Sequence, residues 1–128
     1  MTTNYDSMVV LTTGKQDRGA RATLAFSWAC SALALGKKTA IFLTMDGTVW
    51  SLQGFADGVQ VDGFEPLSCY VESFLSMGGK MFVCAPCTEY YCGQTSGNRS
   101  ERFVEEAQIA GLTTVVSSAD RNCQLVTF

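Results

Sequence analysis

The sequence predicts an α/β domain in which a mostly parallel five-stranded sheet carries helices on both of its faces. Short apolar segments alternate along the chain with stretches of helical periodicity, and glycine or proline separates many of them. The chain has 128 residues, 47% of them hydrophobic, which matches one compact domain with its own core. We therefore expect a single domain over residues 1–128, built as a three-layer sandwich with right-handed crossovers.

The first part of the chain is predicted to supply two strands with a helix between them. Residues 8–13 and residues 39–44 are compact apolar segments of strand length. Between them, apolar side chains recur at helical spacing from Arg18 onward. Gly36 follows the last of these side chains, so we expect the helix to end there.

The middle of the chain is predicted to be less regular. Residues 46–55 are a candidate short helix, and residues 56–65 are predicted to be a loop because they contain several acidic side chains and two glycines. Pro66 is suited to begin the next helix, since its missing amide hydrogen would be unpaired at that position. Gly78 ends this helix, and Lys80–Cys84 is the predicted third strand.

The last third is predicted to contain one helix and two strands. Asn98 or Ser100 can cap a helix that ends at Gly111, because the apolar residues between them have helical spacing. Residues 112–116 and residues 124–128 are then the two final strands. These elements complete the predicted alternation of strands and helices.

The composition excludes several classes of function. Histidine is absent, which excludes Ser-His-Asp triads, Cys-His nucleophile pairs and mixed Cys/His zinc sites. The formal charge is −3 and the basic residues do not cluster, so we expect no nucleic-acid partner. Neither a signal segment nor a membrane-spanning stretch is evident. We therefore expect a cytoplasmic protein with no membrane partner and with reduced thiols.

The densest chemical signal is a group of three cysteines at the end of the predicted third strand. Cys84, Cys87 and Cys92 follow the spacing Cys-x₂-Cys-x₄-Cys. Ligands and chemistry collect beyond the carboxyl ends of parallel strands, which is where this segment is expected to lie. All three are candidate catalytic residues, whereas Cys30, inside the predicted first helix, is expected to be a packing residue.

The spacing of these thiols allows three kinds of chemistry. Cys84 and Cys87 form a Cys-x-x-Cys pair, which is typical of dithiol redox centres. Three thiolates can instead hold zinc or an iron–sulfur cluster, with Cys123 as a distant fourth ligand. One thiol can also carry sulfane sulfur as a persulfide and pass it to an acceptor thiolate. The chain lacks a second Cys-x-x-Cys pair, so we expect no resident metal or other cofactor.

Three segments together carry a family resemblance. They are residues 9–14 with the alanine-rich helix and strand that follow, residues 78–84, and residues 111–116. In this order they make the chain resemble the small DsrE/DsrF-like sulfur carrier proteins of the DsrEFH/TusBCD superfamily. The resemblance is closest to the DsrE-type subgroup linked to cytoplasmic sulfur oxidation.

The resemblance implies a sulfurtransferase-type function in which Cys84 carries the persulfide and relays its sulfur between protein thiols. It also implies a homotrimer, or a hexamer of two trimers, with the thiol loop near a subunit interface. A rhodanese-like sulfur donor and a TusA-like acceptor are the implied partners. Many relatives have one cysteine in this loop, whereas this chain has three, which leaves the roles of Cys87 and Cys92 open.

Overall fold

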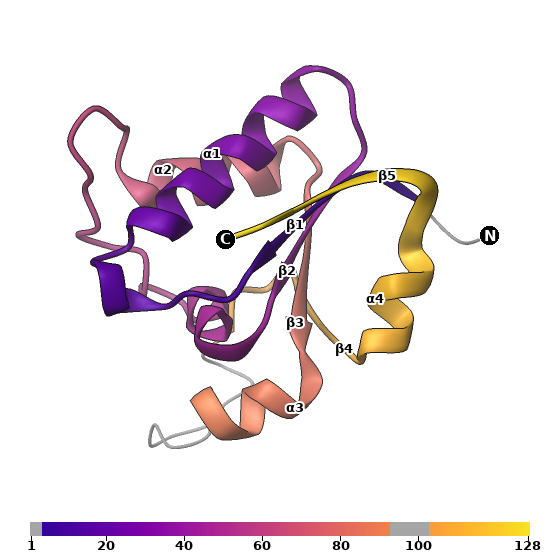
Figure 1. The fold of residues 1–128 in the computed structure, drawn as a ribbon. Coiled ribbons are helices and arrows are strands. Elements are labelled where there is room, and N and C mark those ends of the chain that lie inside the picture. The colour runs from indigo at the N-terminus through magenta and orange to yellow at the C-terminus, as the bar shows by residue number, and fades with distance from the viewer. Residues whose placement is uncertain (1–3, 93–102) are drawn as a thin grey trace.

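Five parallel strands form a single sheet in the computed structural model, which describes residues 4–92 and 103–128 (Figure 1). Their spatial order is β4-β3-β2-β1-β5, and every neighbouring pair is parallel. The strands are β1 (Tyr5–Leu11), β2 (Thr39–Leu43), β3 (Lys80–Cys84), β4 (Ala107–Ala110) and β5 (Ala119–Thr127). The predicted α/β fold with a parallel five-stranded sheet is confirmed.

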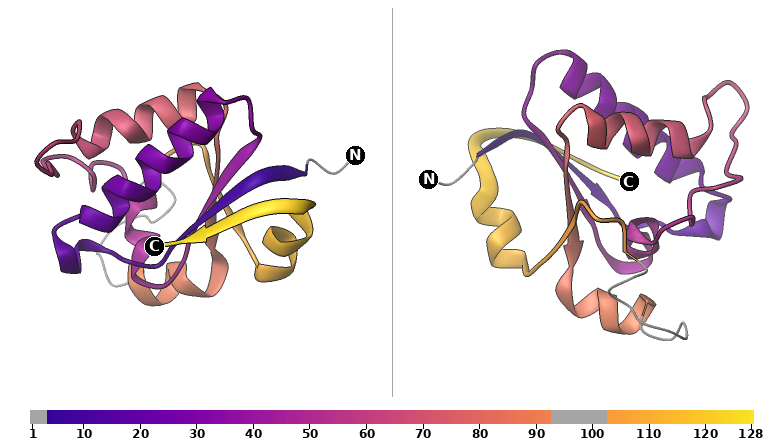
Figure 2. Two further views of the ribbon diagram at one scale, coloured as in Figure 1. Left: turned by 45° about the horizontal axis from the view of Figure 1, so that its top comes forward. Right: turned by 180° about the vertical axis from the view of Figure 1, so that it is seen from behind.

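Helices cover both faces of the sheet, as the sequence predicts. Helices α1 (Ala20–Ala34) and α2 (Leu67–Ser76) lie side by side on one face, and α4 (Leu112–Ser118) lies on the other (Figure 2). Alternate residues of a strand point to opposite faces. Met81 and Val83 of β3 therefore pack in the α1/α2 core, whereas Phe82 and Cys84 pack in the core beneath α4. No helix of the described residues is both long and apolar enough to cross a membrane.

The connections after β1, β2 and β3 each begin with a short helical turn. The turns are η1 (Lys15–Asp17), η2 (Met45–Ser51) and α3 (Ala85–Cys87), and α3 continues into η3 (Thr88–Cys92). The predicted short helix over residues 46–55 is thus a 3₁₀ helix that begins one residue earlier and ends at Ser51. In a parallel sheet these turns all lie at the carboxyl edge, where η2 and α3 are neighbours (Figure 1).

The last third differs from the sequence prediction. Ala107–Ala110, predicted as the end of a helix, is strand β4, which pairs with β3 from Met81↔Ala107 to Cys84↔Ala110. Residues 112–116, predicted as a strand, belong to helix α4, and the final strand β5 begins at Ala119. Pairing with β3 makes Ala107–Ala110 a strand, and burial of the α4 residue Val115 against the sheet favours a helix over residues 112–118. The predicted caps Asn98 and Ser100 lie outside the described residues.

Candidate functional site

Two of the three candidate cysteines lie together at the carboxyl edge of the sheet. Cys84 is the last residue of β3, and Cys87 follows one turn later in α3, which has Pro86 in its first turn. Both side chains are buried in the core beneath α4, with 5% and 7% of their surface exposed. The two thiols are joined by a hydrogen bond, so the Cys-x-x-Cys spacing forms one local sulfur pair.

The sulfur of Cys87 is surrounded by hydrogen-bond donors from the end of β2. The backbone amide of Met45 donates to Cys87 Sγ at 3.2 Å. Thr44 Oγ1 lies 3.6 Å from the same sulfur. Thiolates are stabilised by such donors, particularly where burial excludes water. The second strand therefore supplies the polar surroundings of a thiol that the third strand delivers.

The amide of Met45 faces Cys87 because the backbone turns sharply at this residue. Met45 has a φ of 53°, in the left-handed region that non-glycine residues seldom adopt. Two residues later, the Gly47 amide donates to the carbonyl oxygens of Thr12 and Thr44. A Cβ atom at Gly47 would collide with the carbonyl oxygen of Leu11, so only glycine permits η2 to pack this closely against the end of β1.

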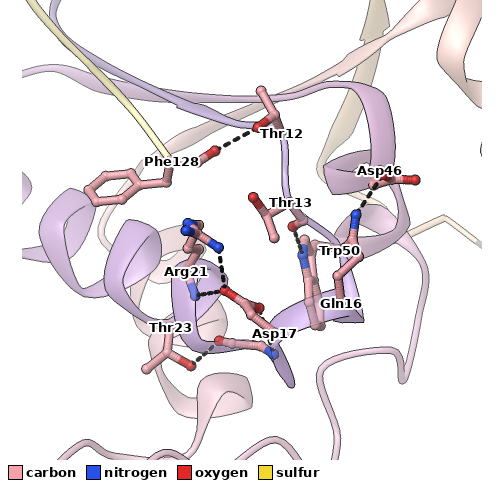
Figure 3. Close-up of polar contacts among 10 residues, drawn as sticks. Thr12, Thr13, Gln16, Asp17, Arg21, Thr23, Asp46, Trp50 and Phe128 are labelled. Atoms are coloured by element: carbon pink, nitrogen blue, oxygen red, sulfur yellow. Dashed lines mark hydrogen bonds and ion pairs between the residues drawn. The ribbon is translucent and has the colours of Figure 1, made fainter.

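Side-chain contacts to the turn after β1 also hold η2 in place (Figure 3). Trp50 Nε1 donates to the carbonyl oxygen of Thr13 at 2.8 Å, and the Trp50 side chain is buried. Gln16 Nε2 donates to Asp46 Oδ2 at 2.6 Å. These contacts join the ends of β1 and β2, and they fix the segment that presents the Met45 amide to the sulfur.

The two thiols differ in acidity. Burial raises the pKa of Cys87, but hydrogen bonds from Cys84, Thr44 and the Met45 amide, with a further contribution from the nearby Thr48 hydroxyl, outweigh burial and lower it. Burial raises the pKa of Cys84, and the hydrogen bond with Cys87 raises it further, against smaller opposing contributions from Thr44 and the Cys87 amide. These opposite shifts favour Cys87 over Cys84 as the site of the first negative charge on the pair.

The remaining cysteines lie away from this pair or outside the described side chains. Cys92 ends η3, and its side chain is not among those described. Cys30 packs between α1 and α2 and its Sγ donates to the carbonyl oxygen of Tyr70 at 3.4 Å, which agrees with its predicted packing role. Cys69 is exposed on α2. Cys123 is half-buried on β5, where burial and the nearby Asp120 raise its pKa.

The described residues contain no group of three cysteine or carboxylate side chains with the spacing of a metal site. In particular, Cys123 does not join Cys84 and Cys87 as a third ligand. No arrangement of side chains in the described part of the chain therefore supports the metal hypothesis. Among the cysteines proposed as ligands, Cys92 is the one whose side chain is not described.

Sequence reasoning did not identify the residues that surround Cys87. Thr44, Met45 and Thr48 have no motif that marks them as functional. Thr44 is the last residue of the predicted second strand, and adjacent parallel strands end at the same edge of a sheet. The signal that would have found it is therefore topological, since it requires that β2 lie beside β3.

Comparisons with known proteins agree with this architecture. A model described as the DsrE/DsrF-like family matches residues 6–128. An uncharacterized protein of Methanocaldococcus jannaschii, MJ0760, is 30% identical over 115 residues; the match covers 90% of this chain and 40% of that protein. The chain thus spans less than half the length of this curated relative.

A solved structure extends the agreement to three dimensions. The crystal structure of the ychN protein from E. coli superposes with a TM-score of 0.67 at 15% sequence identity. The superposition covers 96% of this chain and 99% of that chain. The two proteins therefore share their fold over almost their whole lengths.

Proposed function

Because this chain belongs to the DsrE/DsrF-like family, we propose that it carries sulfane sulfur as a cysteine persulfide and passes it between protein thiols. The family is generally linked to sulfur relay. The observation that supports the proposal is the Cys84–Cys87 pair, in which two buried thiols share a hydrogen bond beside the donors of Thr44 and Met45. Persulfide transfer requires a thiolate that attacks sulfur, and this pair provides a stabilised one.

The transfer needs no external oxidant or reductant. In loading, a cysteine thiolate of the pair attacks the outer sulfur of a donor persulfide. The sulfur–sulfur bond of the donor breaks, the donor leaves as a thiolate, and the outer sulfur remains on the cysteine as a persulfide. In unloading, an acceptor thiolate repeats the same attack on the cysteine persulfide, so each step exchanges one sulfur–sulfur bond for another.

We also propose that the chain acts as a homo-oligomer, a trimer or a hexamer, with the thiol pair near a subunit interface. The face that carries helix α4 leaves large apolar side chains exposed: Leu112, Val116 and Leu125 are 59–69% exposed. An apolar groove of about 370 Å³ on the same face reaches Thr44, the residue that contacts Cys87. Exposed apolar patches of this kind mark interaction surfaces, and symmetric self-association is the commonest way to bury them.

The proposed partners follow from the family. We propose a rhodanese-like protein as sulfur donor and a TusA-like protein as acceptor, and we place the exchange in the cytoplasm. The described cysteines Cys30, Cys69, Cys84, Cys87 and Cys123 are all free thiols, the form that reducing compartments maintain. We further propose that this exchange serves sulfur oxidation, the role to which the DsrE-type subgroup is linked.

Intact-protein mass spectrometry tests the proposed function directly. The reduced protein is incubated with polysulfide, separated from the reagent, and measured with and without a reductant. We expect a reductant-sensitive gain of one sulfur mass in the wild type and in Cys69→Ser, whose thiol is exposed and remote from the pair. The double variant Cys84→Ser/Cys87→Ser should show no gain.

Two other results would contradict the proposal. A gain of sulfur that persists in the double variant would move the carrier to another thiol, and Cys92→Ser would then test the third loop cysteine. A loss of two hydrogens without added sulfur would favour the dithiol redox function, which the contact between Cys84 and Cys87 also suits.

A further inference from the structure

We propose that Cys87 is the thiol that attacks the sulfur donor and holds the persulfide, with the Met45 amide and the hydroxyls of Thr44 and Thr48 stabilising its charge. This inference rests on the proposed function and assigns the roles within its thiol pair. It differs from the assignment that the family resemblance implies, in which Cys84 is the carrier. The two assignments predict opposite results for the two single-cysteine variants.

The contacts to Cys87 Sγ are those that a thiolate requires. The amide of Met45 lies 3.2 Å away and the Thr44 hydroxyl 3.6 Å away, while the side chain is only 7% exposed. A neutral thiol is a weak hydrogen-bond acceptor, so converging donors contribute most when this sulfur is ionised. The strained backbone at Met45 is the conformation in which its amide reaches the sulfur.

The hydroxyl of Thr48 provides an independent observation. Thr48 is fully buried, and its Oγ1 atom has no hydrogen-bond partner of ordinary geometry among the described residues. It nevertheless lies near enough to Cys87 to contribute to the lowered pKa of that thiol. An unsatisfied buried hydroxyl is costly, and a negatively charged sulfur at Cys87 is the kind of acceptor that this hydroxyl lacks.

The same arrangement gives Cys84 a different role. As a thiolate, Cys84 would attack the inner sulfur of a Cys87 persulfide, which would form a Cys84–Cys87 disulfide and expel hydrosulfide. Burial and the hydrogen bond to Cys87 raise the pKa of Cys84, which disfavours the thiolate that this attack requires. Cys84 is therefore a positioning residue that donates to Cys87 and leaves the carried sulfur in place.

The single variants Cys84→Ser and Cys87→Ser test the assignment in the same polysulfide loading assay. We expect Cys84→Ser to gain one sulfur mass, because serine retains a hydroxyl donor, and Cys87→Ser to gain none. Loss of loading in Cys84→Ser alone, in both variants, or in neither would overturn the assignment while leaving a sulfur carrier in place. Circular dichroism of each variant controls for folding.

A second measurement holds even if polysulfide does not load the wild type, a result that would contradict the proposed function instead. The alkylation rate of each thiol is followed against pH by peptide mass mapping. The alkylation midpoint of a thiol is the pH at which its alkylation rate reaches half of the maximum. The alkylation midpoint of Cys87 should lie at lower pH than that of Cys84. A midpoint for Cys84 at or below that of Cys87 would overturn the inference.

The two hydroxyls are tested by Thr44→Val and Thr48→Val, which remove a donor and preserve the shape of the side chain. Each should raise the alkylation midpoint of Cys87 by about half to one pH unit, the effect of one weakened hydrogen bond to a charged group. Thr48→Ser should restore the wild-type midpoint.

The matched control for these variants is Thr39→Val. Thr39 is as buried as Thr48 and lies at the opposite end of β2 from Thr44, and its hydroxyl donates to the carbonyl oxygen of Lys37. The alkylation midpoint of Cys87 in Thr39→Val should equal that of the wild type. Midpoints that do not move in Thr44→Val and Thr48→Val, or that move equally in Thr39→Val, would exclude a role for the two hydroxyls.

Discussion

Individual residues determine how two neighbouring thiols divide one negative charge. Cys87 Sγ accepts a hydrogen bond from the Met45 amide and lies beside the Thr44 hydroxyl, whereas the Cys84 thiol acts as a donor to Cys87. A low pKa in one thiol and a high pKa in its neighbour are the usual condition for directed sulfur exchange, because only the thiolate attacks. The pattern Cys-x-x-Cys is visible in the sequence, but this asymmetry arises from residues about forty positions away.

The donor role of Cys84 predicts a pH effect at the residue scale. Cys84→Ala removes the S–H donor, so the Cys87 thiolate loses stabilisation and its pKa rises. The alkylation midpoint of Cys87 should therefore move to higher pH in Cys84→Ala and stay closer to the wild-type value in Cys84→Ser, which keeps a hydroxyl donor. Peptide mapping of iodoacetamide-treated protein over a pH series measures both midpoints. Equal midpoints in the two variants would show that the hydrogen bond from residue 84 does not stabilise the Cys87 thiolate.

At the scale of elements, the sequence predicted those parts of the fold whose apolar patterns are unambiguous. The buried strands β2 and β3 read as continuous apolar runs, and α1 ends near Gly36 as predicted. Edge strand β4 has only four residues, and its character comes from pairing with β3. Helix α4 contains β-branched residues that favour a strand locally, so its burial against the sheet could not be predicted from the sequence pattern.

The packing of η2 against β1 predicts that Gly47→Ala disturbs the site from a distance. The new Cβ atom would meet the Leu11 carbonyl, so η2 must shift, and the Met45 amide would move away from Cys87 Sγ. We expect a loss of about 1–3 kcal/mol in the free energy of unfolding, typical of overpacking. We also expect the alkylation midpoint of Cys87 to rise.

The control for this variant is Gly111→Ala, where φ is −81° and no atom lies within 4 Å of the added Cβ. Its free energy of unfolding should stay within about 1 kcal/mol of the wild type. Urea denaturation measures both variants. If Gly47→Ala were as stable as Gly111→Ala and kept the Cys87 midpoint, the close packing of η2 would not be what positions the amide.

For the whole molecule, the unequal covering of the two sheet faces is the feature with the largest consequence. Helices α1 and α2 bury one face, whereas the short helix α4 covers only part of the other (Figure 2). Cys84 and Cys87 belong to the core of that second face, and its groove extends to Thr44. A second copy seated there would lie close to the thiol pair, so assembly and sulfur exchange would share one surface.

This surface predicts that Val116→Glu dissociates the proposed oligomer. Val116 is 69% exposed on α4, so a charge costs little in the isolated subunit but would be desolvated in an apolar interface. Leu35→Glu is the matched control, because Leu35 is 78% exposed at the end of α1, on the opposite side of the sheet. Sedimentation velocity should find a monomer for Val116→Glu and a wild-type oligomer for Leu35→Glu, with similar melting temperatures for the isolated subunits. A monomeric wild type, or an oligomer unaffected by Val116→Glu, would show that the α4 face is not a subunit interface. The thiol pair would then act without residues of a second copy at this face.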